Sequence, residues 1–155
     1  MDWLLELLWR YGVLAILLGV SLWLCVSDVH HRRLPDRDVA WVLIFSLITN
    51  VQYHIGVSTV LSMAAVLVFG FILFALRVIA AGDIKLLTAY CAAIPFSLLP
   101  TVLMLMALSG GVIAACYITR TAIDKRPERL KQQGLPYGIP IAFAGYSGVI
   151  LATLI

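Results

Sequence analysis

Residues 57–79, VSTVLSMAAVLVFGFILFALRVI, decide the fold class of this 155-residue chain. The stretch holds a single charged residue, Arg77, close to its end. A helix of about 20 mainly apolar residues is long enough to cross the hydrocarbon core of a membrane. The sequence therefore predicts a transmembrane helix here.

The whole chain shares this apolar character. Hydrophobic residues make up 63% of it and charged residues 12%, and the mean hydropathy is +1.03. Soluble domains have about 45–50% apolar and about 25% charged residues, so an ordinary soluble globule and a disordered chain are both excluded. The net charge of +3 is a small excess that is gathered in one place, which argues against a nucleic-acid partner.

Further apolar runs are separated by polar or proline-containing breaks. We expect about six transmembrane helices, over residues 11–27, 39–55, 57–79, 84 to 95–100, 101–119 and 139–155. The fourth run is short and contains Pro95. Six such helices use the whole chain, so residues 1–155 are predicted to form a single all-α transmembrane domain. The N-terminus lacks the pattern of a cleaved signal peptide, and we expect it in the mature protein.

The basic residues predict how the chain lies in the membrane. All of the 11 Lys and Arg residues except Arg10 fall in or beside the first, third and fifth loops. Lys and Arg accumulate on the cytoplasmic side of membrane proteins. We therefore expect cytoplasmic odd-numbered loops, both termini outward, and contacts of the basic loops with anionic lipid headgroups.

The sequence offers little support for a metal or cofactor site, and we expect none. The cysteines Cys25, Cys91 and Cys116 lie inside apolar runs, without a Cys-x-x-Cys pair or a histidine at zinc spacing. They are expected to be small packing residues. His30 and His31 are adjacent and would point about 100° apart on a helix, which does not suit a shared metal ion.

Two carboxylates stand out, because an acidic residue at a membrane span is a functional candidate. Asp28 directly follows the first apolar run, Asp83 lies between the third and fourth, and the topology places both at the cytoplasmic face. Two close carboxylates share a proton, so one is a base and the other an acid, as aspartic proteolysis requires. Structural interpretations stay open: Asp83 as a helix N-cap, and Asp28 paired with Arg32 or Arg33.

Three stretches of the chain resemble, in order, the motifs of the type IV prepilin peptidases. Residues 28–36, DVHHRRLPD, are similar to an aspartate after a span, a basic stretch and Ile-Pro-Asn. Residues 80–85, AAGDIK, are similar to Gly-x-Gly-Asp-x-Lys. Residues 135–142, LPYGIPIA, are similar to the Pro-Tyr-Gly-x-Ala-Ile element before the last span. The matches cover essentially the whole chain.

The resemblance implies an aspartic endopeptidase with Asp28 and Asp83 as its catalytic pair. Its substrates would be prepilin or pseudopilin precursors, cut between a short basic leader and a hydrophobic helix. The enzyme would lie in the bacterial inner membrane, with its active site at the cytoplasmic face. The residues expected to shape the site are Pro35, Ala80, Gly82, Lys85, Pro136, Tyr137 and Gly138.

Two of these residues carry more than one interpretation. Gly82 would let the backbone approach a substrate strand or bend sharply, or it is an ordinary loop glycine. Lys85 would orient the substrate or tune Asp83, or it only anchors the helix at the cytoplasmic face. Which aspartate is the acid, and the oligomeric state, stay open.

The chain departs from the family pattern in ways that leave alternatives. Ala80 replaces the first motif glycine, and Asp36 replaces asparagine. The insertion with paired Cys-x-x-Cys, associated with N-methylation, is missing, so the chain resembles the short, peptidase-only branch of the tight-adherence pilus systems. Archaeal preflagellin peptidases are a related short group. The alternatives are a proton- or ion-coupled transporter, or a peptidase-like secretion subunit made inactive by Ala80.

Overall fold

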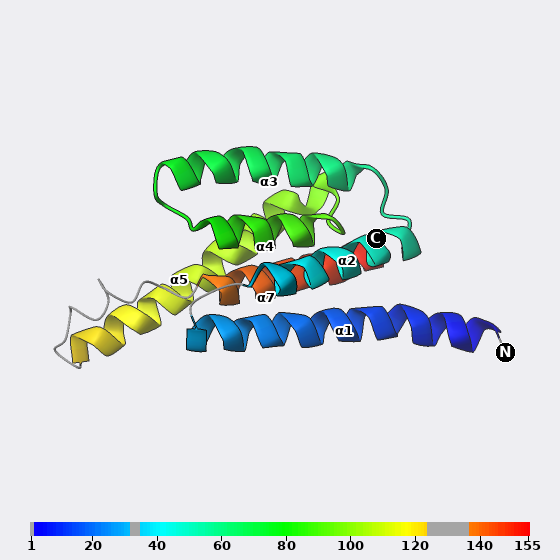
Figure 1. Ribbon diagram of the computed structural model, residues 1–155, viewed down its shortest axis with the longest axis horizontal. Helices are drawn as coiled ribbons and strands as arrows, with labels where there is room; N and C mark the ends of the chain where they lie inside the picture. Colours follow the sequence, from blue (N-terminus) through cyan, green and yellow to red (C-terminus); the bar gives the residue numbers. More distant parts are fainter. Residues whose placement is uncertain (1, 32–34, 124–136) are drawn as a thin grey trace.

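The computed structural model describes residues 2–31, 35–123 and 137–155. This part of the chain folds into six α-helices and a short 3₁₀ turn, without a β-strand (Figure 1). The elements are α1 (Asp2–His31), α2 (Asp36–Gln52), α3 (Ser58–Ala75), α4 (Ala81–Cys91), η1 (Phe96–Leu98), α5 (Leu99–Ile123) and α7 (Gly138–Leu154). The prediction of an all-α chain is confirmed.

Successive helices run in opposite directions, so the two chain termini lie at the same end of the bundle (Figure 1). The end of α1 and the starts of α2, α4 and α7 lie together at the opposite end. This arrangement brings the described parts of the three stretches singled out in the sequence to one end of the molecule.

Three segments are long and apolar enough to cross a membrane: Leu8–Asp28, Ser58–Ala75 and Phe96–Cys116. The helices α2 and α7 have 17 residues each and are slightly shorter. The helix α4 has 11 residues, a length of about 16 Å, which is far less than the roughly 30 Å of a hydrocarbon core. The structure thus supports a helical membrane protein, while the number of six spans stays a prediction.

The fourth helix begins and ends several residues earlier than predicted. It begins at Ala81, because the Ala80 carbonyl accepts hydrogen bonds from the N–H groups of Asp83 and Ile84, at 3.1 and 3.4 Å. It ends at Cys91, before Pro95, which has no N–H and disfavours a helical conformation in the residue before it. The first helix also extends beyond the predicted 11–27, so Asp28 lies inside α1.

The centre of the bundle is α4, which packs against α2, α3 and α7. Tyr90 of α4 is fully buried, and its hydroxyl lies 2.6 Å from Ser21 Oγ of α1. Gly145 of α7 lies flat against the Tyr90 ring, since a Cβ atom there would be 2.5 Å from ring carbons. These contacts hold together α1, α4 and α7, the helices that carry the candidate site.

The other end of the bundle is fixed by Asn50 near the end of α2. Its Nδ2 donates to Thr59 Oγ1 at 2.9 Å and to the Ala92 carbonyl at 2.8 Å, and its Oδ1 accepts from the Gly56 N–H at 3.1 Å. One side chain thus ties α2 to the start of α3 and to the end of α4. The contacts of Tyr90 and of Ala92 therefore hold the C-terminal end of α4, the end remote from Asp83.

Candidate active site

Asp28 lies in the last turn of α1 and is buried, with 8% of its surface exposed. Its Oδ2 accepts a hydrogen bond of 2.9 Å from the backbone N–H of Gly138, the first residue of α7. The first N–H groups of a helix have no partner within the helix and carry partial positive charge, so they suit a carboxylate. Asp28 therefore joins the end of α1 to the start of α7.

Gly138 is required at this contact because it has no side chain. A Cβ atom on Gly138 would lie 2.7 Å from Oδ2 and 2.8 Å from Cγ of Asp28, which is closer than such atoms approach in proteins. The close approach of α7 to Asp28 therefore depends on Gly138, while its role in shaping a site stays a prediction.

Asp83 lies in the first turn of α4 and is also 8% exposed. The N-cap of this helix is Ala80, and the cap residue makes no side-chain hydrogen bond. The interpretation of Asp83 as the N-cap is therefore wrong, because the helix begins before it. The Asp83 carboxyl remains available for another role.

The two carboxyl groups interact electrostatically. Asp83 lies outside the three candidate spans, in a helix too short to cross a membrane. Burial raises the pKa of Asp83 to about 6, the negative charge of Asp28 contributes to this rise, and a hydrogen bond of the Ala80 backbone partly offsets it. Asp83 can therefore take up and release a proton close to neutral pH.

Ala80 and Gly82 have ordinary backbone conformations. Ala80 has φ −78° and ψ 150°, which is extended backbone open to any residue. Gly82 lies in the first helical turn of α4 and makes no sharp bend. The alanine in place of the motif glycine therefore introduces no backbone strain.

Lys85 forms an ion pair with Asp36, the residue that replaces the motif asparagine. Lys85 Nζ lies 2.8 Å from Asp36 Oδ1, and both side chains are exposed. Pro35 is the N-cap of α2, and its carbonyl accepts from the N–H groups of Asp38 and Val39. Pro35 thus sets the start of α2 and, with it, the position of Asp36.

Sequence reasoning missed Asp36 as a partner of Lys85. The available signal was their opposite charge at the same predicted membrane face, but this holds for several acidic and basic residues. The three-dimensional position of α2 against α4 was needed to select the pair.

Two further residues were predicted to shape the site, and the structure describes one of them, Tyr137. Tyr137 is the N-cap of α7, is exposed, and accepts a hydrogen bond from the Ile141 N–H through its carbonyl. Pro136 lies outside the described residues, as do Arg32 and Arg33. The alternative pairing of Asp28 with these two arginines is therefore not tested.

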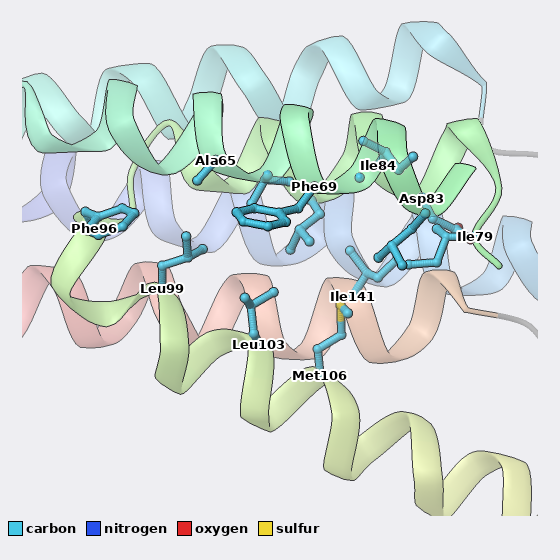
Figure 2. Close-up of a pocket in the computed structure, with 14 residues that line it drawn as sticks. Ala65, Phe69, Ile79, Asp83, Ile84, Phe96, Leu99, Leu103, Met106 and Ile141 are labelled. Atoms are coloured by element: carbon cyan, nitrogen blue, oxygen red, sulfur yellow. The ribbon is translucent and has the colours of Figure 1, made fainter. Parts of the chain in front are cut away.

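A cavity of about 250 Å³ adjoins Asp83, between α3, α4 and α5 (Figure 2). Asp83 and Ile79 lie at one end of it, and Phe96 lies at the other. The arrangement places a titratable carboxyl at the end of an apolar groove.

Nothing in the described ranges 2–31, 35–123 and 137–155 resembles a metal centre. No group of three or more His, Cys, Asp or Glu side chains there is arranged to hold an ion. The cysteines are free thiols. The absence of a metal or cofactor stays a prediction.

Comparison with known proteins gives one family match. The model of the type IV leader peptidase family matches residues 15–115, about two thirds of the chain. The matched range includes both Asp28 and Asp83 and ends before Gly138. Searches of curated proteins and of solved structures found no match.

Proposed function

The chain belongs to the type IV leader peptidase family, and we propose that it is an aspartic endopeptidase that removes the basic leader from prepilin or pseudopilin precursors. Membership of this family supports the general function of a membrane peptidase that acts on pilin-like precursors. The observation that carries the finer proposal is the pair Asp28 and Asp83, two buried carboxyls at the same end of the bundle.

The geometry favours a division of roles. The Gly138 N–H donates to Asp28, and such a donor suits a charged carboxylate. Asp28 is therefore the base that takes a proton from water, while the water oxygen attacks the carbonyl carbon of the scissile bond. Asp83, whose pKa of about 6 lets it hold a proton near neutral pH far more often than an ordinary carboxyl, gives that proton to the carbonyl oxygen as the tetrahedral intermediate forms. As the intermediate breaks down, Asp28 gives the proton taken from water to the leaving amine, the C–N bond breaks, and Asp83 takes back a proton from the hydroxyl group that becomes the new carbonyl.

We place the site at the cytoplasmic face of the bacterial inner membrane. Arg37, Arg77 and Lys85 lie at the same end of the bundle as the aspartates, as expected for cytoplasmic loops. Arg10 instead lies near the opposite end, with its guanidinium 5.3 Å from the centre of the Tyr53 ring. A leader in the cytoplasm would thus reach the carboxyl pair directly.

The test is processing of a pilin precursor in membranes. A precursor with a basic cytoplasmic leader is co-expressed with the wild type, Asp28→Asn or Asp83→Asn, and the N-terminus of the product is read by mass spectrometry. We expect cleavage by the wild type and none by either variant at equal protein levels. Cleavage that survives either substitution would show that the catalytic pair is wrong.

The same experiment addresses the alternatives. A transporter binds its ions near the middle of the bilayer, whereas Asp28 is the last residue of the span Leu8–Asp28 and Asp83 lies outside the spans. An inactive subunit would leave every precursor uncut. An intact precursor with the wild type, across several pilin types, would favour one of these alternatives over the peptidase.

A further inference from the structure

The groove that ends at Asp83 is apolar along its length. Its described lining comes from α3, α4, α5 and α7 and from the turns beside them, and Asp83 is the only charged residue in this lining. Leu99, Leu103 and Met106 rise from α5 toward the groove, and Phe69 enters it from α3 (Figure 2). The lining therefore suits an apolar occupant, and Asp83 lies at one end of it.

The groove is walled by helices that are long and apolar enough to cross a membrane. Its walls include Ser58–Ala75 and Phe96–Cys116, two of the three candidate spans. Only 11% of the second of these spans is buried within the chain, so α5 offers most of its surface to another membrane component. Figure 2 shows α5 diverging from α3 toward the Asp83 end of the groove.

The volume of the groove limits what enters it. An apolar cavity of about 150 Å³ accepts one benzene molecule, so 250 Å³ accepts roughly two large side chains and not a whole helix. A helix would therefore lie along the opening and insert two side chains of one face, spaced three or four residues apart.

We propose that this groove binds the first turns of the apolar helix that follows the scissile bond in the precursor, a proposal that rests on the proposed function. A peptide bond held at Asp83 continues directly into the groove, because the two are contiguous. A precursor whose leader lies in the cytoplasm runs outward in the membrane, the direction from Asp83 to Phe96. A phospholipid is disfavoured, since its phosphate would face the Asp83 carboxyl.

The role of the groove is tested by filling it with a larger side chain. Leu103 lines the groove, whereas its neighbour Met104 is 64% exposed and does not line it. We expect Leu103→Trp to lower kcat/KM for the full precursor about tenfold or more, mainly through KM, because overfilling an apolar pocket excludes the substrate. Met104→Trp is expected to stay within about twofold of the wild type. Equal effects of the two substitutions would overturn the proposal.

A second measurement does not depend on the folding of the tryptophan variant. A photo-reactive benzophenone amino acid is placed at position 103 or 104 in an Asp28→Asn background, which leaves the groove lining unchanged because Asp28 does not line it. After irradiation of membranes containing the precursor, mass spectrometry identifies the partner. We expect adducts to the first two turns after the cleavage site from position 103 and not from position 104.

The outcomes separate the two proposals. Adducts from position 103 to lipid alone, or to a second copy of the chain, would overturn the groove assignment even if the wild type cleaves the precursor. An uncut precursor with the wild type would instead contradict the proposed function, whatever the adducts are.

Discussion

At the scale of single residues, Gly138 shows how the absence of a side chain can allow two helices to meet at a candidate site. Its N–H reaches Asp28 only because no Cβ stands between α7 and the carboxylate. The backbone of Gly138 lies at the start of an ordinary helix, so its role is space and not conformational freedom.

We predict that Gly138→Ala lowers precursor cleavage by about tenfold or more, because the added Cβ displaces α7 from Asp28 and removes a charge-assisted hydrogen bond. Gly111→Ala is the matched control, since a Cβ there meets nothing within 4 Å. Cleavage rates are measured in membranes at equal enzyme levels. Similar rates for both variants would contradict the role assigned to the contact.

Asp83 makes stability depend on pH. Its folded-state pKa of about 6 is raised from 3.8, so the fold gains stability from the protonated carboxyl below about pH 4 and loses it as the pH rises through 6. We predict that Asp83→Asn is more stable than the wild type above pH 7, by up to roughly 3 kcal/mol. The difference should vanish near pH 4. Thermal unfolding of the detergent-solubilised proteins between pH 4 and pH 8 measures it, and a constant difference would contradict the assignment.

The inactive-subunit alternative depends on Ala80, which replaces the first glycine of the family motif. Its extended backbone is equally open to alanine and glycine. We therefore predict that Ala80→Gly changes precursor cleavage by less than about twofold. The assay compares both proteins on the same precursor. Activity that rises from nothing on this substitution would support the inactive-subunit alternative for the native chain.

At the scale of elements, the ion pair between Asp36 and Lys85 links the start of α2 to the start of α4. We predict that Lys85→Asp lowers kcat/KM for the precursor roughly fivefold, because the new aspartate faces Asp36 with a like charge. Adding Asp36→Lys to this variant restores opposite charges and should restore kcat/KM. Exposed ion pairs contribute little to stability, so the unfolding temperature should change little.

The control for this prediction is Asp38→Lys combined with Lys85→Asp. Asp38 lies in the same turn as Asp36, but it accepts a hydrogen bond of 3.2 Å from Trp23 Nε1 and does not pair with Lys85. Restored cleavage in this second pair would mean that net charge, and not the contact, matters.

The sequence predicted the positions of some helices better than those of others. Hydrophobic runs separated by polar breaks located α1, α2, α3, α5 and α7, because a membrane helix needs a long apolar segment. The bounds of the short α4 lie several residues from those predicted, since the Ala80 carbonyl caps its start and Pro95 limits its end, and hydropathy reports neither effect. The sequence likewise left open whether Asp83, which lies in the first turn of α4, was the N-cap of this helix.

The candidate site was predicted in part. Asp28 and Asp83 stood out because a carboxyl beside an apolar run is unusual. The bond between Asp28 and Gly138 joins residues 110 positions apart, and the groove is made by several helices. No local pattern encodes such contacts, which depend on how α1, α4, α5 and α7 pack.

At the scale of the whole molecule, alternating helices place the termini at one end and the aspartates at the other (Figure 1). Val57 and Val78 are exposed valines in the loops before and after α3, and they mark these two ends. Basic residues near Val78 predict that its end is cytoplasmic. A pair of cysteine variants can therefore test the orientation on which the proposed leader-processing site depends.

In a background with Cys25, Cys91 and Cys116 replaced by alanine, we predict that Val57→Cys reacts with a membrane-impermeant maleimide in intact cells. Val78→Cys should react only after the membrane is permeabilised, because α3, which is long and apolar enough to span a membrane, is expected to cross it between the two positions. The reverse pattern would place Asp28 and Asp83 outside the cytoplasm, where they could not meet a cytoplasmic leader. Labelling of both from outside would mean that α3 does not cross, and the groove beside it could not receive a membrane helix.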